Sequence, residues 1–387
     1  MRKRTALIAL MLLLVSAGAR AEAKLMMRQT TDYFSTVSAL FLYVEQGEEA
    51  AFERVWAEVK ETLGEIESAV SVSDPSSDIA RFNALPCGGE LAVSGITADL
   101  MRTAREAFDR TGGLYDPTIY PLVDLWGFSP RFNDYFYTPS LPYDRAPENG
   151  RLPLPDPGHI DALLPLVGLD GVRLTERDGQ TWLKKETPPV EIDGIDIQAQ
   201  LDLGGIAKGY ACDRVIALLR ENGFSQGHFV CGGSSLAVMS RPSDDGTYEL
   251  TLIKPRQTSN EGKHYAAVRV RDIGISTSVD VSQSFALDGV TYCHIIDPRT
   301  GWPINMPDED GVQRGLAGAT LLGDDAALCD ALTTALLVMG PEDAMDYLKR
   351  NGETAAALVA FRSDAETCDV MGDMPGLTIS DPAYIKR

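Results

Sequence analysis

Residues 201–223 read "LDLGGIAKGYACDRVIALLRENG", an apolar segment that passes through two glycines into a long helical pattern. We expect a strand over 195–205 and then the clearest helix of the chain over 206–223, which Asn222 and Gly223 end. Strand-like runs follow downstream, at 227–240, 248–255, 265–272 and 274–280. Because strands come in runs rather than alternating strictly with helices, the pattern predicts an α+β fold with mixed, largely antiparallel sheets and packed helices.

Further helices are expected where apolar residues recur at helical spacing, at 48–71, 97–113, 157–168, 329–340 and 342–352. Residues 171–185 are typical of a β-hairpin with Asp178 and Gly179 at its turn. A stretch rich in Pro and Tyr at 129–158 shows no periodicity. Because long structureless loops are uncommon inside a compact domain, we interpret this stretch as a surface insertion.

The N-terminus has the pattern of a secretory signal peptide. A basic start is followed by an apolar stretch over 6–17, and Ala19-Arg20-Ala21 fits a cleavage site. We therefore predict that residues 1–21 are removed and that 22–387 form a mature periplasmic protein. The apolar stretch is too short to span a bilayer, and no cysteine stands at the cleavage point, so we expect no stable membrane anchor.

The chain is strongly acidic, with 35 Lys and Arg against 56 Asp and Glu and a formal net charge of −21. Such a surface repels nucleic acid and anionic membranes, which bind proteins through Lys and Arg. Any phosphate site must therefore be built locally from a metal, main-chain N–H groups and a few basic residues. Most of the six cysteines stand in apolar runs, and no C-x-x-C pair occurs, so we expect buried thiols.

Three groups of residues are candidates for chemistry. In the first, Gly204 and Gly205 permit close approach of the backbone to a ligand, and the start of the helix offers N–H groups to a phosphate. Lys208 would add a positive charge. The stretch matches neither usual nucleotide fingerprint, so a glycine-tightened turn with a surface lysine is the alternative interpretation.

The second group lies in "HIIDPRTGWP", residues 294–303. His294 and Asp297 flank a turn set by a proline and a glycine, and Arg299 could face a phosphate. Taken alone, a histidine is more often structural than a base. The density of polar groups within a few residues nevertheless indicates a functional loop.

The third group lies in "CDALTTALLVMG", residues 329–340. Asp330 and Thr334 are four residues apart, so a helix would present both oxygens on one face. A carboxylate and a hydroxyl are hard ligands that suit Mg²⁺, which takes its other ligands from water and phosphates. The alternative is that Asp330 only caps the start of the helix.

Seven blocks of the sequence, spanning about residues 30–360, resemble in the same order the flavin transferase (ApbE) family of FAD:protein FMN transferases. The blocks are "SVSDPSSDIARFN" (71–83), "GGLYDPTIYPLVDLWGF" (112–128), "LDLGGIAKGYACD" (201–213), "CGGSSLAV" (231–238), "GISTSVD" (274–280), "DGVTYCHIIDPRTGWP" (288–303) and "DALTTALLVMG" (330–340). The sixth block is the most specific of them.

The resemblance implies a Mg²⁺-dependent enzyme that binds FAD, splits its pyrophosphate, releases AMP and transfers FMN to a Thr or Ser hydroxyl of an acceptor protein. The expected acceptors are proteins of exported electron-transfer or ion-pumping complexes. It also implies one α+β catalytic domain with a smaller subdomain, and FAD in the cleft between them.

The resemblance also assigns roles by position. Asp330, Thr334 and the main-chain carbonyl of Ala207 match the family's metal ligands, and His294 matches its candidate general base. The expected FAD-binding residues are Ser73, Asp116, Gly204, Gly205, Lys208, Asp297 and Arg299.

Some positions depart from the family pattern. Ser73 stands where an aromatic residue is usual, and Val279 stands where a glycine is frequent. Loss of a ring near the flavin makes hydrolysis of FAD to FMN and AMP a rival function, and a flavin-binding protein without turnover is a second rival. "Gly-Ala-Thr" around Thr320 is similar to an acceptor motif, but the segment reads as a core strand.

Overall fold

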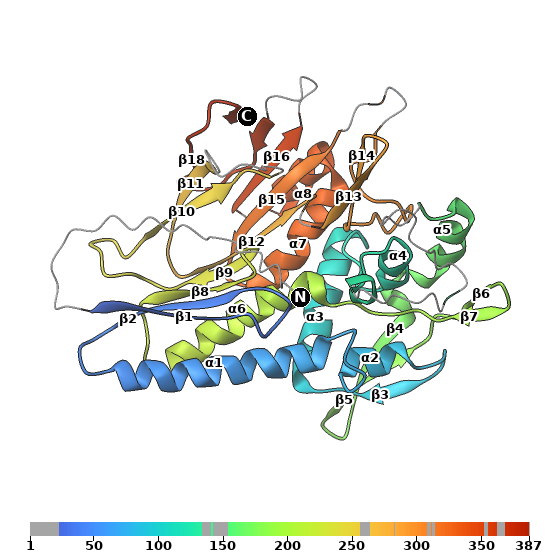
Figure 1. Ribbon diagram of the computed structural model, residues 1–387, viewed down its shortest axis with the longest axis horizontal. Helices are drawn as coiled ribbons and strands as arrows, with labels where there is room; N and C mark the ends of the chain where they lie inside the picture. Colours follow the sequence, from blue (N-terminus) through green and yellow to red (C-terminus); the bar gives the residue numbers. More distant parts are fainter. Residues whose placement is uncertain are drawn as a thin grey trace, which may run out of the picture.

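The computed structural model describes residues 23–133, 141, 154–255, 264–281, 283–307, 311, 314–351, 355–361 and 368–386. The predicted signal peptide at 1–21 and most of the predicted insertion at 129–158 lie outside the described residues. Figure 1 shows a large sheet with helices on one face and a small sheet on the other.

Within the described residues, the large sheet has nine strands and is antiparallel except at one edge. In spatial order the strands are β1 (Lys24–Thr30), β2 (Ser38–Val44), β8 (Gly227–Cys231), β9 (Ser235–Val238), β12 (Ile273–Val279), β15 (Leu316–Gly323), β16 (Ala355–Phe361), β17 (Cys368–Met371) and β19 (Tyr384–Lys386). The pair β17 and β19 is parallel. This arrangement confirms the α+β class and the largely antiparallel sheet.

Two central helices cover one face of this sheet (Figure 1), namely α6 (Gly204–Glu221) and α7 (Ala326–Met339). Helix α7 is apolar and buried on nearly every side, as expected of a helix with other elements packed around it. It contacts α6, strands β12 and β15, and helix α3 (Gly95–Thr111). Helix α1 (Glu49–Val70) packs on α6, and α8 (Pro341–Asn351) follows α7.

A three-stranded sheet covers the opposite face. It consists of β10 (Tyr248–Ile253), β11 (His264–Val270) and β18 (Thr378–Ile379). Buried residues alternate with exposed ones along β10, because one face of the strand packs inward and the other meets water. Tyr248 and Tyr265 join Ile275 of the large sheet in one apolar cluster, which forms the core between the two sheets.

The smaller elements complete the chain. They are α2 (Asp78–Asn83), β3 (Glu90–Ala92), α4 (Tyr120–Leu125), the 3₁₀ turns Pro130–Asn133, Leu164–Leu166 and Leu169–Gly171, α5 (Pro157–Leu163), and the hairpins β4 (Val172–Arg177) with β5 (Gln180–Lys185), β6 (Val190–Ile192) with β7 (Ile195–Ile197), and β13 (Ser284–Leu287) with β14 (Val290–Cys293). Trp126, Leu163 and Tyr292 belong to a separate apolar cluster that joins α4, α5 and the last two hairpins.

One predicted strand is wrong in extent. Of the segment 195–205, only Ile195–Ile197 forms a strand, and Gln200 makes an isolated bridge to Ile119. The reason is that the main-chain groups of the segment bond to a side chain and a loop rather than to a neighbouring strand. The N–H of Asp202 bonds to the Pro117 carbonyl, and both main-chain groups of Leu201 bond to the Asn83 side chain. Helix α6 begins at Gly204, so both glycines lie in the helix.

The other predicted elements are present. Helices occupy the five further expected regions, and the hairpin at 171–185 turns at Asp178 and Gly179, which have φ angles of 52° and 73°. Such left-handed angles are those of the tight turn expected there. Four of the described cysteines are buried, and Cys87 is exposed. The side chain of Cys368 lies outside the description.

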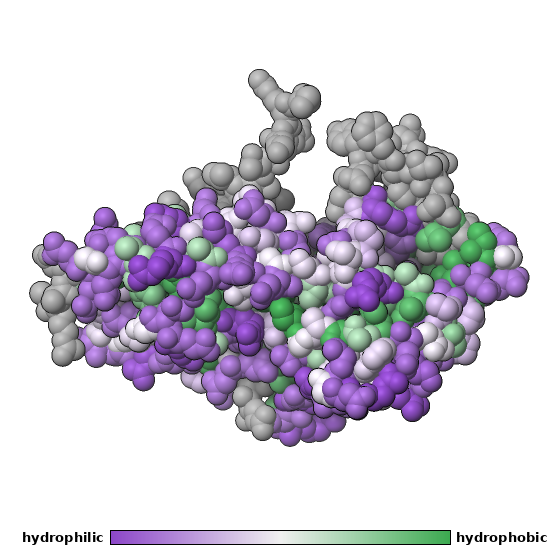
Figure 2. Space-filling view, turned by 90° about the horizontal axis from the view of Figure 1, so that it is seen from below, coloured by the Kyte–Doolittle hydropathy of each residue, from purple (hydrophilic) through white to green (hydrophobic). Residues whose placement is uncertain are grey.

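The surface seen in Figure 2 is mainly hydrophilic, with apolar residues in separate patches. Within the described residues, no helix combines the length and the apolar composition needed to cross a bilayer.

Candidate active site

The start of α6 and the middle of α7 meet in the buried layer above the sheet. The main-chain N–H of Gly209 donates a 3.1 Å hydrogen bond to Oδ2 of Asp330. Asp330 is only 4% exposed. Burial raises the pKa of its carboxyl group, while the charge of Lys208, the Gly209 N–H and the hydroxyl of Ser235 act in the opposite direction. A cation bound here would therefore relieve an unfavourable buried charge.

Asp330 does not cap α7, so that alternative interpretation is wrong. The capping residue is Asp325, whose side chain accepts a hydrogen bond from the Leu328 N–H at 2.8 Å. Asp213 of α6 also accepts from the first N–H groups of α7, those of Ala326 at 3.1 Å and Ala327 at 2.9 Å. With the end of the helix satisfied by these two carboxylates, the carboxylate of Asp330 is left for another role.

Strand β12 supports the two predicted side-chain metal ligands from below. Ser276 lies 3.3 Å from the hydroxyl of Ser235, which in turn donates to Asp330. Ser278 lies 3.5 Å from the hydroxyl of Thr334. Ser276 and Ser278 are two residues apart, so they point to the same face of the strand. Ser276 therefore supports Asp330 through Ser235, and Ser278 supports Thr334 directly.

Gly205, in the first turn of α6, leaves a hollow the size of one methyl group between neighbouring side chains. A Cβ atom at this position would be 3.4 Å from Cε2 of Tyr115, 3.9 Å from Oγ1 of Thr334 and 4.0 Å from the Tyr115 hydroxyl. These are ordinary contact distances, so the missing methyl group leaves space between two hydroxyls. Ala207 follows in the same turn, two residues before Gly209.

Lys208 lies one turn into α6. Its Nζ donates to the Gly204 carbonyl at 3.0 Å, and its charge acts on the carboxyl groups of Asp330 and Asp202. The turn at Gly232, whose φ of +72° favours glycine, packs against the stem of Lys208. The cation is therefore held next to the start of α6.

His294 directly follows the last residue of β14. Its ring Nδ1 lies 3.2 Å from the carbonyl oxygen of Gln283, and its own main-chain N–H bonds to the same oxygen. Burial and the charge of Lys208 lower the pKa of His294 to about 4, so the ring is neutral at pH 7. With the proton on Nδ1 facing the carbonyl, Nε2 is left as an acceptor.

Asp297 and Arg299 form a salt bridge with each other. Nε and Nη2 of Arg299 contact the Asp297 carboxylate at 2.9 Å and 2.7 Å, and Nη2 lies 3.4 Å from the Val338 carbonyl. Val338 is one turn beyond Thr334 on α7. Arg299 thus joins the loop to the end of α7 here, and its predicted contact with a nucleotide stays a prediction.

Asp116 and Ser73 lie in tight local structure. The buried Asp116 accepts from the N–H and the hydroxyl of Thr118 at 2.8 Å and 2.6 Å, and burial raises its pKa to about 6. Ser73 is exposed, and its N–H bonds to Ser71 at 3.3 Å. The predicted FAD contacts of both residues stay predictions.

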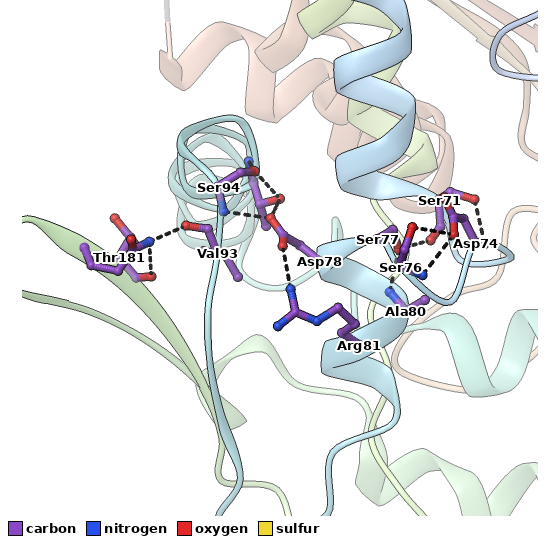
Figure 3. A network of polar contacts seen from close by, with 12 residues as sticks. Ser71, Asp74, Ser76, Ser77, Asp78, Ala80, Arg81, Val93, Ser94 and Thr181 are labelled. Carbon is purple, nitrogen blue, oxygen red and sulfur yellow. Dashed lines mark hydrogen bonds and ion pairs between the residues drawn. The ribbon is translucent and has the colours of Figure 1, made fainter.

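The block around Ser73 also has a structural role, shown in Figure 3. Ser77 caps α2 through the Ala80 N–H at 2.9 Å. Asp78 then ties α2 to the start of α3, because Oδ2 accepts from the Ser94 N–H at 2.7 Å and from Thr97 at 2.8 Å. These hydrogen bonds stabilise the N-terminal ends of α2 and α3.

Four residues that border the site were not predicted from the sequence: Tyr115, Asp202, Ser235 and Ser276. They stand inside blocks of the family resemblance, but the residues that they border in the site are far away in sequence. Ser235 and Ser276 are 41 residues apart. Among the described residues, no three His, Cys, Asp or Glu side chains gather into a metal site. The candidate ligands are instead one carboxylate, one hydroxyl and one main-chain carbonyl.

Comparison with known proteins shows the family of this chain. The model of the ApbE family matches residues 31–359. An FAD:protein FMN transferase from Salmonella typhimurium is 29% identical over 276 residues, which cover 71% of this chain and 68% of that protein. One from Vibrio cholerae is 27% identical over 348 residues, which cover 90% and 91% of the two chains.

Solved structures show the same fold. The crystal structure of Pseudomonas stutzeri flavinyl transferase ApbE in the apo form superposes with a TM-score of 0.68 at 26% identity, over 88% of this chain and 92% of that chain. The flavin transferase ApbE from Vibrio cholerae gives 0.68 at 25% identity, over 88% and 96% of the two chains.

Proposed function

The chain belongs to the ApbE family, and on that premise we propose that it transfers FMN from FAD to a Ser or Thr hydroxyl of an acceptor protein, with Mg²⁺ and with release of AMP. One observation carries this proposal. The buried Asp330 carboxylate accepts a hydrogen bond from the Gly209 N–H beside Lys208, and the charge of Lys208 acts on this carboxyl group and on the neutral His294 ring. Such a site suits phosphoryl-type transfer to a hydroxyl.

The donor set fits Mg²⁺. Asp330, Thr334 and the Ala207 carbonyl would hold the ion, and all three offer oxygen. The buried carboxylate has a raised pKa, and the hollow at Gly205 leaves space beside Thr334. When bound, Mg²⁺ supplies charge that offsets the negative pyrophosphate as its P–O bond breaks.

His294 would accept the proton in the transfer step. The oxygen of the acceptor hydroxyl attacks the phosphorus of the FMN half, and the bond from this phosphorus to the AMP oxygen breaks. The hydroxyl proton passes to Nε2 of His294, because Nδ1 faces the Gln283 carbonyl. AMP leaves with the bond electrons, and FMN stays on the acceptor as a phosphoester.

Lys208 and the start of α6 would bind the anion. The N-terminal end of this helix carries partial positive charge, and Lys208 adds a full one next to it. In a chain with a net charge of −21, such a local source of positive potential is needed to hold a pyrophosphate.

Hydrolysis of FAD is the second candidate function. Ser73 favours it, because its exposed side chain has no ring that could shield a flavin from water. Water would then replace the acceptor hydroxyl, and the products would be free FMN and AMP. A flavin-binding protein without turnover is the third, and it requires no role for Asp330 or His294.

We also propose that the chain is exported to the periplasm and acts on an exported electron-transfer or ion-pumping protein. The proposal rests on the basic, apolar and small-residue pattern of residues 1–21. Periplasmic extraction followed by N-terminal sequencing tests it. A mature chain that begins at Glu22 is expected, and a cytoplasmic chain with an intact N-terminus would overturn it.

Intact mass spectrometry tests the transfer. An acceptor domain with a Ser/Thr-Gly-Ala-Thr motif is incubated with the protein, FAD and Mg²⁺. A gain of one FMN, abolished by EDTA or by Asp330→Ala, supports transfer and the metal site together. Free FMN and AMP beside an unmodified acceptor support hydrolysis instead. If FAD stays intact with several acceptors, a binding protein is favoured. Replacing the final Thr of the motif by Val is the matched control.

A further inference from the structure

Tyr115 has a buried hydroxyl without a partner. The side chain is only 4% exposed, and the hydroxyl oxygen has no hydrogen bond among the described residues. Leaving a buried hydroxyl unpaired destabilises the folded protein. A ligand that supplied a hydrogen-bond partner would satisfy this group.

The hydroxyl borders the candidate active site. It lies 4.0 Å from the point where a Cβ of Gly205 would be, and Oγ1 of Thr334 lies 3.9 Å from the same point. The two hydroxyls therefore face one hollow at the start of α6. The charges of three carboxylates, Asp330, Asp202 and Asp116, also act on the phenol. Burial and these charges raise its pKa well above the ordinary value, so the phenol keeps its proton and can donate it.

The segment that carries Tyr115 is firmly placed. The Tyr115 N–H bonds to the hydroxyl of Thr111 at 3.1 Å, at the end of α3. Two residues later, the Pro117 carbonyl accepts from the Asp202 N–H at 2.8 Å, just before α6 begins. The main chain around Tyr115 is thus tied to both α3 and α6, as suits a residue that positions a ligand.

We infer that the Tyr115 hydroxyl donates a hydrogen bond to a pyrophosphate oxygen of FAD bound at the hollow beside Gly205, and so positions the phosphorus that is attacked. This inference rests on the proposed function, because it takes FAD as the ligand. A hydroxyl donor suits an anionic oxygen, and the bond would satisfy the group that the chain leaves unpaired. Tyr115 is then a binding residue beside Lys208, which provides charge.

Tyr115→Phe tests the inference, because it removes the hydroxyl and keeps the ring that packs near Gly205. The dissociation constant of FAD with Mg²⁺ is measured by flavin fluorescence, for the full chain and the variant. We expect it to rise about tenfold, since hydrogen bonds to charged groups are the stronger ones. Riboflavin, which has no phosphate, should bind both proteins equally.

Thermal unfolding without ligand separates this role from a structural one. Removing an unpaired buried hydroxyl should leave the Tm unchanged or raise it. Tyr210→Phe is the matched control, because its hydroxyl bonds to Asp99 on α3, 3.3 Å away, and should leave FAD affinity unchanged.

Two results would overturn the inference. One is an FAD dissociation constant within twofold of the parent protein, and the other is a lower Tm with an equal loss of riboflavin binding. If the parent protein transfers FMN while Tyr115→Phe binds FAD normally, only this inference fails. If the parent protein neither binds nor transfers, the proposed function fails with it.

Discussion

Gly209 on α6 and Asp330 on α7 are joined by a 3.1 Å hydrogen bond from a main-chain N–H to a carboxylate oxygen. The bond exists because the two helices are in close contact. A Cβ on Gly209 would lie 2.2 Å from the Ala326 carbonyl oxygen, far inside contact distance. The glycine therefore sets the helix spacing and, through it, the position of the buried carboxylate.

Gly209→Ala should force α6 and α7 apart. We expect the free energy of unfolding to fall by about 2 kcal/mol, as for an overpacked core, and Mg²⁺-dependent FMN transfer to fall with it. Urea unfolding and intact mass of the acceptor measure the two effects. A variant as stable as the parent would mean that the helices adjust without loss.

Gly205→Ala should behave differently, although it lies in the same helix. The added methyl group meets no atom closer than 3.4 Å, so the fold accommodates it. Alanine favours the helix, and we expect stability to stay equal or rise by about 0.5–1 kcal/mol. The methyl group fills the hollow, however, so affinity for FAD with Mg²⁺ should fall at least tenfold. Unchanged affinity would place the pyrophosphate elsewhere.

Asp330→Asn should separate stability from activity. Burial disfavours the ionised form of the Asp330 carboxyl group and raises its pKa, while an amide needs no charge and keeps an oxygen for the Gly209 N–H. We expect an unchanged or higher Tm and a loss of transfer of at least a hundredfold. Differential scanning calorimetry and the transfer assay measure these. Full activity of the variant would contradict the proposal that Asp330 is a metal ligand.

Ser278→Ala should weaken the response to Mg²⁺. Its hydroxyl lies 3.5 Å from Thr334 and 2.8 Å from Thr333, and loss of a group behind a metal ligand typically lowers metal affinity 10- to 100-fold. The Mg²⁺ concentration for half-maximal transfer should rise accordingly. Thr277→Val is the control, because Thr277 bonds to Thr320, on the neighbouring strand, at 2.9 Å. An equal shift in both variants would point to general loosening.

His294 should keep transfer active in mildly acidic solution. Its pKa is lowered from 6.5 to about 4, so the neutral ring that accepts a proton persists as pH falls from 8 to 5. We expect kcat/KM to be nearly constant over that range. His294→Gln should lose transfer while it still binds FAD. An acid limb near 6.5 in kcat/KM would contradict the lowered pKa.

His228 should make the fold sensitive to acid. This histidine is 2% exposed, its ring stacks on Phe41 at 4.5 Å, and neither ring nitrogen has a partner among the described residues. Burial lowers its pKa from 6.5 to about 4. The folded state favours the neutral ring, whereas the unfolded state takes up a proton near pH 6.5. The protein is therefore most stable above pH 6.5 with respect to this residue, and it loses free energy of unfolding as the pH falls toward 4.

His228→Phe removes that dependence. Relative to the variant, the parent should lose about 3 kcal/mol of unfolding free energy between pH 7 and pH 4. Urea unfolding of both proteins at several pH values measures the difference. Parallel curves would show that the histidine titrates normally in the folded protein.

Local patterns account for the elements that the sequence predicted well. Asp330 and Thr334 lie in one helix because apolar residues surround them at helical spacing, and Asp178-Gly179 makes the hairpin turn because both residues accept left-handed angles. Most of the segment 195–205 does not form the predicted strand. A pattern of apolar and polar residues cannot predict which groups bond to the main chain of that segment. Asn83, more than a hundred residues earlier, bonds to the main chain of Leu201.

Residue types and short spacings in the sequence were enough to predict the α+β class, the helices and the hairpin, the family resemblance and the candidate roles of His294, Asp330 and Thr334. Three relationships emerged only from the folded chain: Ser235 supports Asp330, Arg299 is paired with Asp297, and Tyr115 faces Gly205. These relationships depend on which atoms folding brings together and which it leaves unpaired, and a hydrogen bond between distant residues leaves no local pattern in the sequence.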